Sequence, residues 1–156
     1  MLKFFINSNN RAYLRGLASE FGESTNAIRV ELNRLEEAGM LNSNLEGNKK
    51  YFQANKEHSL FKEVQSIVRK YVGLDKVIEQ VVVKLGDVKA VYLTGEWAKG
   101  KESEVIDLYL VGENIDKHYL LELIEKTEGL IGKKIKYLVY QEDLAKDDNV
   151  LLLWKD

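Results

Sequence analysis

The chain has 156 residues, of which 45% are hydrophobic and 31% charged, which suits one ordinary globular domain or two very small ones. It contains no cysteine, and its two histidines, His58 and His118, are far apart in sequence, so disulfides, thiolate metal sites and histidine metal clusters are excluded. The net charge of −2 at pH 7 argues against a protein that coats nucleic acid over its whole surface.

The charge is unevenly distributed along the chain. Residues 1–56 carry eight Lys/Arg and six Asp/Glu, whereas residues 57–156 carry fifteen and nineteen. No apolar run approaches the roughly 20 residues that span a bilayer, and residues 1–6 are too short for a signal-peptide core. We therefore expect no membrane association and a cytoplasmic location.

The first helices are predicted from their caps and their apolar spacing. Residues 1–6 are apolar and are expected to be the end of a helix. Asn9 or Asn10 can cap a helix over residues 11–21, and Gly22 is expected to end it in a left-handed conformation.

A second helix and a hairpin are expected to follow. Ser24 is the predicted cap of a helix over residues 25–38, which Gly39 ends. Two short strand-like runs then flank a pair of turn residues. The runs and the turn are residues 40–44, Gly47-Asn48 and residues 51–54.

The second half of the chain is expected to be a separate α+β domain. Amphipathic helices are predicted over residues 59–73 and 74–85. The remaining predicted elements are strands at 88–94, 106–111 and 135–140 and a helix at 116–129. The predicted domains are residues 1–58, a connecting helix over 59–73, and residues 74–156.

The spacing of three residues predicts a helix-turn-helix in the first domain. Ala18 is a small residue that lets a second helix pack closely, Gly22 supplies the turn, and Ile28 anchors the second helix. The outer face of that helix offers short polar groups and one arginine to base edges, and two lysines lie beside the hairpin tip. The expected DNA-binding residues are Ser24, Thr25, Asn26, Arg29, Asn33, Lys49 and Lys50.

This segment resembles the winged helix-turn-helix of the ArsR-type family of bacterial regulators. The resembling residues are YLRGLASEFGESTNAIRVELNRLEEAGMLNSNLEGNKKYFQAN, about a third of the chain. The resemblance implies binding of double-stranded DNA and a homodimer, whose half-sites would lie about one helical turn apart. The family's metal-sensing cysteines are absent, so metal sensing is not implied.

A second resemblance lies in the segment VYLTGEWAKGKESEVIDLYLVG, which is similar to the minimal nucleotidyltransferase signature. In that signature Gly-Ser holds a triphosphate, and two carboxylates at positions i and i+2 of a strand bind Mg²⁺ from one face. A third carboxylate on a later strand completes the metal site. The family pairs this domain with a winged helix, so the two resemblances support each other.

The chain departs from this signature wherever chemistry would occur. Gly95 is kept, but Glu96 replaces the serine and would oppose a phosphate. Asp107 matches one aspartate, so its missing partner is Val105 or Tyr109. Residues 135–140 offer no third acid, and Glu104 falls on the opposite strand face from Asp107. Two of the three carboxylates are therefore missing, and we expect a degenerate nucleotide site at Gly95, Glu96 and Asp107 with no metal, no cofactor and no catalysis.

Three hypotheses follow from these patterns. The first is a DNA-binding transcriptional regulator whose second domain dimerises or senses a small-molecule or protein effector. The second is an active nucleotidyltransferase of the toxin–antitoxin type, which would use Asp107 and an unrecognised acid. The third is a protein-interaction adaptor. Trp97 can stack on a nucleotide base, but an aromatic residue packed under a loop is the expected outcome.

Overall fold

The computed structural model describes residues 2–143 and 150–156 and has a mixed α/β fold with two sheets. The chain divides into two compact units, residues 1–65 and residues 66–156, which are described separately. The division falls inside helix α4 (Phe61–Val72), within the segment expected to connect two domains. None of the described helices combines the length and the apolar character that crossing a bilayer requires.

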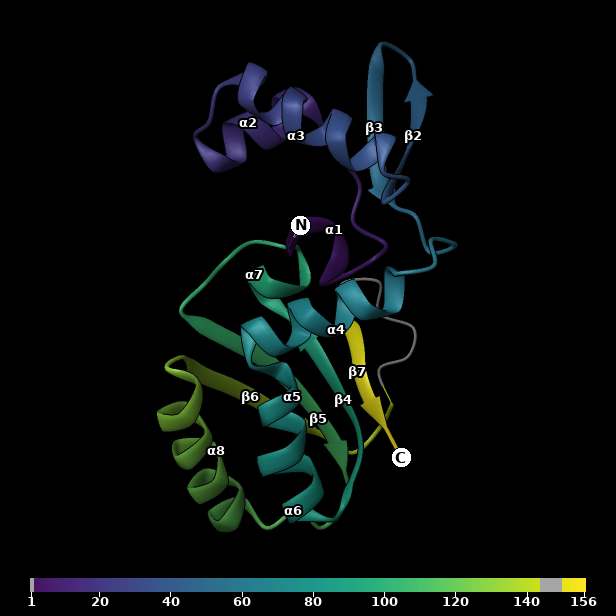
Figure 1. Cartoon of the computed structure of the whole chain (residues 1–156). Coiled ribbons are helices and arrows are strands. Elements are labelled where there is room, and N and C mark those ends of the chain that lie inside the picture. The colour runs from purple at the N-terminus through teal and green to yellow at the C-terminus, as the bar shows by residue number, and fades with distance from the viewer. Residues whose placement is uncertain (1, 144–149) are drawn as a thin grey trace. The chain divides into compact units, whose positions relative to one another are not determined.

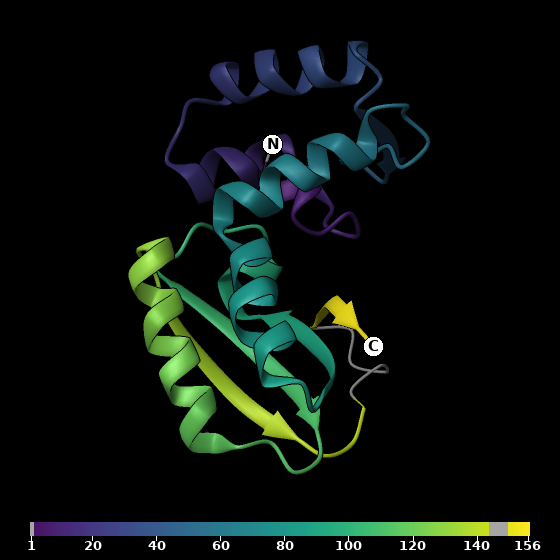
Figure 2. The same ribbon diagram turned by 60° about the horizontal axis from the view of Figure 1, so that its bottom comes forward.

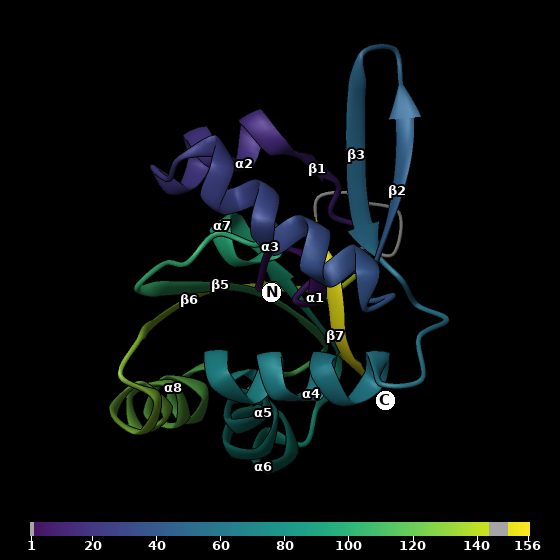
Figure 3. The ribbon, with the colours of Figure 1, turned by 45° about the horizontal axis from the view of Figure 1, so that its top comes forward.

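Unit 1 is a helix pair followed by a hairpin (Figure 1). Its three-stranded antiparallel sheet has the order β1-β3-β2, and α3 lies beside the hairpin (Figure 3). Its elements are α1 (Leu2–Phe5), β1 (Ala12–Tyr13), α2 (Leu14–Phe21), α3 (Thr25–Glu37), β2 (Leu41–Glu46) and β3 (Lys49–Ala54).

The expected start of the first long helix is wrong. Ala12 and Tyr13 instead pair with β3, opposite Phe52 and Tyr51, so their backbone groups serve the sheet and α2 begins at Leu14. Tyr13 occupies the cap position and makes no side-chain cap hydrogen bond.

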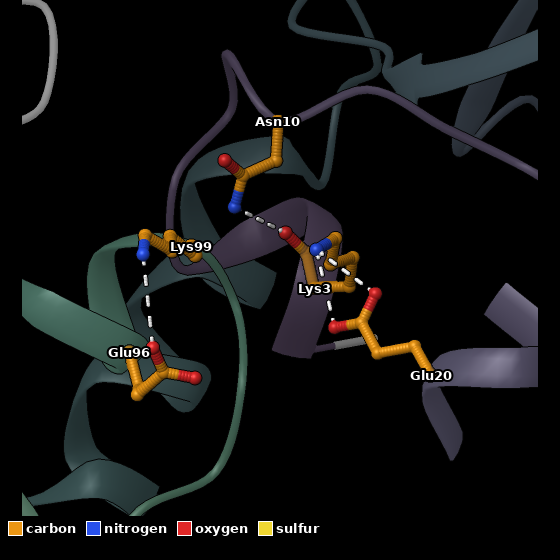
Figure 4. Close-up of polar contacts among 5 residues, drawn as sticks. All are labelled: Lys3, Asn10, Glu20, Glu96 and Lys99. Carbon is orange, nitrogen blue, oxygen red and sulfur yellow. Dashed lines mark hydrogen bonds and ion pairs between the residues drawn. The ribbon is translucent and has the colours of Figure 1, made fainter. Parts of the chain in front are cut away.

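Neither asparagine caps this helix. The backbone N–H of Asn9 donates to Asn7 Oδ1 at 3.1 Å. The side-chain amide of Asn10 donates to the Lys3 carbonyl at 2.8 Å, as Figure 4 shows. Both residues therefore belong to a turn that precedes β1.

The other predicted helix ends of unit 1 are confirmed. Gly22 has φ +64° and donates its N–H to Ala18, so a left-handed glycine ends α2. Ser24 Oγ accepts the Ala27 N–H at 3.1 Å and caps α3, which ends at Glu37. The hairpin is longer than predicted, since the two strands pair up to Glu46 and Lys49 across the Gly47-Asn48 turn.

Unit 2 is a four-stranded mixed sheet with helices on one face, visible as α5, α6 and α8 in front of the strands in Figure 2. The strand order is β6-β5-β4-β7, in which β5 and β6 are parallel and the other pairs antiparallel. Its elements after α4 are α5 (Leu74–Val77), the π-helical turn η1 (Ile78–Val82), α6 (Val83–Leu85), β4 (Val88–Thr94), α7 (Gly95–Ala98), β5 (Val105–Gly112), α8 (Lys117–Ile131), β6 (Lys134–Tyr140) and β7 (Leu151–Lys155).

The predicted strands of unit 2 are confirmed to within a residue at each end, and Asp116 proves to be the cap of α8. Two features differ from expectation. The helix predicted over residues 74–85 is interrupted by the π-helical turn η1, within which both Val81 and Val82 are buried. The edge strand β7 was not predicted.

The central strands of unit 2 have two different faces. Along β5, Ile106, Leu108 and Leu110 are fully buried, whereas Asp107 and Tyr109 between them are half-buried. Because the helices cover one sheet face, the alternation puts the core there and leaves Asp107 on the opposite face.

Candidate functional site

A basic groove lies in unit 1 between α3 and the hairpin. It has a volume of about 480 Å³, and its walls come from β1, α2, α3, the hairpin turn and strand β3. The lining residues are Tyr13, Leu14, Arg15, Arg29, Leu32, Asn33, Asn48, Lys49, Lys50 and Phe52. We call this the hairpin groove.

Four cations converge on the hairpin groove. Arg29 lines it one helical turn before Asn33 on α3, and Arg15 lines it from the start of α2. Within the described part of the chain, Arg15 and Arg29 have no hydrogen bond or ion pair with another side chain, so their charges are available to a ligand.

The two hairpin lysines lie over the aromatic rings of the groove. Lys49 Nζ is 4.4 Å from the centroid of the Tyr13 ring. Lys50 Nζ is 5.1 Å from that of Phe52 and also pairs with Glu36 Oε1 at 3.1 Å. The charge of Lys50 is therefore partly neutralised inside the protein, whereas Lys49 forms no ion pair with any residue that the structure describes and lies over the Tyr13 ring.

The structure brings together four of the seven residues predicted to bind DNA. Arg29, Asn33, Lys49 and Lys50 line one groove. The other three predicted residues are exposed at the start of α3 and lie outside the groove, and the hydroxyl group of Ser24 caps the helix. They are Ser24, Thr25 and Asn26.

The acidic residues of α3 largely face away from the hairpin groove. Glu31 lines a different, apolar groove beside α1, together with Ile28 and Leu35, and pairs with Arg34 at 3.1 Å. The exception is Glu36, which reaches the hairpin and holds Lys50.

Sequence reasoning missed Arg15 and Tyr13. Both residues fall within the amphipathic helix that was predicted over residues 11–21. In such a helix an arginine is expected to be an ordinary solvent-exposed residue. The start of α2 lies against the hairpin because Tyr13 pairs with Tyr51. No local sequence pattern predicts this long-range strand pairing.

A second cleft, the sheet cleft, lies in unit 2 on the face opposite the helices. It has a volume of about 530 Å³. Its lining residues are Thr94, Gly95, Asp107, Leu108, Tyr109, Lys136, Tyr137 and Leu138. Thr94, Asp107 and Lys136 are direct cross-strand neighbours on β4, β5 and β6, so one polar row crosses the sheet at its floor.

Gly95 is required by the conformation of this cleft. Its φ is +69°, and a Cβ at this position would overlap Asp107 Oδ2. The glycine and the carboxylate predicted to share a site therefore do lie against each other.

Glu96 and Trp97 do not contribute to the sheet cleft. Glu96 is exposed and pairs with Lys99 at 3.7 Å, as Figure 4 shows. Trp97 is 2% exposed, and its indole N–H donates to the Ser103 carbonyl at 3.0 Å. Trp97 is thus packed under a loop, as expected, and is not placed to stack on a base.

A buried tyrosine lies on the same sheet face as the cleft. Tyr92 is opposite Tyr109 and donates a hydrogen bond to Asp143. This bond to a carboxylate, together with burial and the negative charge of Asp143, raises the pKa of Tyr92 to about 12. Tyr92 is therefore a neutral structural donor throughout the physiological range.

The sheet cleft does not fit a divalent metal ion. Among the described residues that line it, Asp107 is the one carboxylate, and the residue opposite Asp107 on β6 is Lys136. Nowhere in the described residues do three His, Cys, Asp or Glu side chains gather closely enough to hold a metal. Mg²⁺ prefers carboxylate oxygens, and a neighbouring ammonium opposes it.

Comparison with known proteins identifies no relative by sequence. No protein-family model and no curated protein matches the chain. A solved structure described as a "putative nucleotidyltransferase" from Sulfolobus solfataricus resembles it at 20% identity and a TM-score of 0.39, covering 59% of this chain and 86% of that one. Neither the activity nor the ligands of that protein are transferred to this chain.

Proposed function

We propose that the chain is a DNA-binding regulator in which unit 1 is a winged helix-turn-helix and unit 2 has a nucleotidyltransferase-like fold without catalysis. The observation that carries the proposal is the convergence of Arg15, Arg29, Lys49 and Lys50 on the hairpin groove. Cations gathered beside an exposed helix supply the attraction to phosphates on which DNA affinity depends.

Helix α3 has the length and surface of a recognition helix. It spans 13 residues, and Leu32 is its one fully buried side chain. Asn26, Arg29 and Asn33 are exposed on it, and amide and guanidinium groups can pair with adenine and guanine edges in the major groove. The lysines of the hairpin then contact the backbone and fix the register.

Exposed apolar side chains on α4 support a homodimer. Ile67 and Tyr71 are one helical turn apart and are 66% and 65% exposed. We propose that a second copy of the chain covers these two side chains. A twofold dimer would present two copies of α3 to a DNA with two half-sites.

Unit 2 is proposed to bind a partner or an effector without performing chemistry. Asp107 is the single carboxylate among the described residues of the sheet cleft and has Lys136 as its cross-strand neighbour, an arrangement that does not support two-metal catalysis. Transfer of labelled nucleotide from ATP in the presence of Mg²⁺, abolished by Asp107→Ala, would contradict this part of the proposal.

The test of DNA binding is fluorescence anisotropy of labelled genomic fragments at two salt concentrations. The variant Arg15→Ala/Arg29→Ala/Lys49→Ala removes three cations of the hairpin groove. We expect it to weaken binding and to reduce the slope of log affinity against log salt by about one for each phosphate that the protein no longer neutralises.

The matched control removes three cations of the same unit from outside the groove. Arg11, Arg34 and Lys56 are exposed and do not line it. Their triple alanine variant changes the net charge equally and is expected to retain most of the binding. Equal reductions in affinity for the two variants would show nonspecific attraction, and no binding at low salt would leave unit 1 as an interaction scaffold.

A further inference from the structure

We propose that the ammonium group of Lys136 takes the place of a metal cation in the sheet cleft. The cleft binds the anionic group of a small ligand directly through this lysine and holds no divalent metal ion. The inference concerns unit 2 alone, so it stands or falls separately from DNA binding by unit 1.

The first step is the position of Lys136. It lies on edge strand β6, directly opposite Asp107 in the parallel register, and its side chain lines the cleft. Within residues 2–143 and 150–156, neither side chain has a hydrogen-bond or ion-pair partner. Both charges are therefore available to a ligand.

The second step is the separation of the two charges within the cleft. The Asp107 carboxylate lies against Gly95, at the end of β4, whereas Lys136 belongs to the strand on the other side of β5. The Thr94 backbone is paired with Asp107 on the same side as Gly95. One side of the cleft thus accepts hydrogen bonds, and the opposite side carries a positive charge.

The third step is the chemical class of ligand that this polarity selects. An anionic group such as a phosphate or carboxylate fits Lys136, and an adjacent amino or hydroxyl donor fits Asp107. Tyr109 and Leu138 form an apolar wall along the next cross-strand row, and Leu138 is 56% exposed. The cleft therefore suits a small amphoteric molecule.

The same arrangement excludes a divalent cation. Lys136 is the direct cross-strand neighbour of Asp107, so its positive charge opposes a second cation bound at the Asp107 carboxylate. Val105 and Tyr109, which share the strand face of Asp107, offer no carboxylate in compensation.

The metal arm of the test uses Mn²⁺ and amide NMR spectra of the full chain. We expect no saturable broadening of the Gly95 and Asp107 signals in the native protein. Val105→Asp/Lys136→Asp is expected to gain broadening, and Lys136→Asp alone serves if the double variant does not fold. Broadening in the native protein that Asp107→Asn removes would overturn the proposal, as would variants that fold and still bind no Mn²⁺.

The ligand arm uses O-phosphoethanolamine and inorganic phosphate in the presence of EDTA. We expect both to shift the cleft amides, and Lys136→Met to weaken both about tenfold or more. Asp107→Asn is expected to abolish the preference for O-phosphoethanolamine and to leave phosphate bound. Arg29→Ala/Lys49→Ala is the matched control, because it removes cations of unit 1 only. Absence of shifts in the native protein, or equal shifts in Lys136→Met, would overturn the proposal.

Discussion

The hairpin groove of unit 1 and the sheet cleft of unit 2 differ in how their side chains relate to the fold. The cations of the hairpin groove are the exposed ends of long side chains whose removal leaves the core of unit 1 intact. The sheet cleft is lined by the constrained Gly95 and the buried Leu108, and Gly95 is followed in the chain by the buried Trp97. Binding and stability should therefore be separable in unit 1 and coupled in unit 2.

The largest expected effect is that of Trp97→Ala. The side chain is almost fully buried and its N–H is bonded to Ser103, so its removal should destabilise unit 2 by about 3–5 kcal/mol. Both tryptophans belong to unit 2, so urea unfolding followed by Trp154 fluorescence reports on this unit alone.

Trp97→Phe is the control for the volume of this side chain. It keeps an aromatic ring but removes the hydrogen bond to Ser103, so a smaller destabilisation is expected. If Trp97→Ala costs less than about 1 kcal/mol, Trp97 is not part of the core, and a ligand-stacking role becomes the better explanation of this side chain.

Gly95→Ala tests the close approach of β4 and β5 beneath the sheet cleft. A Cβ in a left-handed conformation, placed against Asp107, should cost about 2 kcal/mol in urea unfolding. Gly132→Ala is the matched control in the same unit, since its φ is also +69° with nothing within 4 Å of the new Cβ. Partial recovery in Gly95→Ala/Asp107→Ala would identify the carboxylate as the obstacle.

How far the sequence predicted the fold depended on whether each signal was local. The Ser24 cap, the Gly22 and Asp116 helix ends and the hairpin turn are set by a few adjacent residues, and all are confirmed. The false helix over residues 11–21 and the missed edge strand β7 are decided by pairing with distant strands.

The candidate sites follow the same rule. Gly95 and Asp107 were predicted from a motif in which the two residues lie twelve positions apart, and they do contact each other. The sequence showed only that β6 lacks an acid. That Lys136 stands opposite Asp107 required the strand register, and Arg15 required the β1–β3 pairing.

The pH dependence of unit 2 should show the bond between Tyr92 and Asp143. An unfolded tyrosine has a pKa near 10, whereas that of Tyr92 is raised to about 12. The resulting stability, about 2 kcal/mol or less, is fully present below pH 10 and is lost as the pH rises from 10 to 12. Ultraviolet titration should therefore show one tyrosine that ionises late, which Asp143→Asn returns toward pH 10. A chain whose tyrosines all ionise together near pH 10 would show that this bond does not form in solution.

The smallest expected effect on stability, and the sharpest on binding, is that of Glu36→Gln in unit 1. The Glu36 and Lys50 side chains are 34% and 45% exposed, so their ion pair should contribute less than about 1 kcal/mol to folding. Removing the carboxylate frees Lys50 to contact a phosphate, and DNA binding should tighten and its salt slope steepen by about one. Glu31→Gln is the matched control, because Glu31 faces the other side of α3. If Glu36→Gln leaves both the affinity and the slope unchanged, Lys50 does not contact DNA, and the interface is confined to Arg15, Arg29 and Lys49.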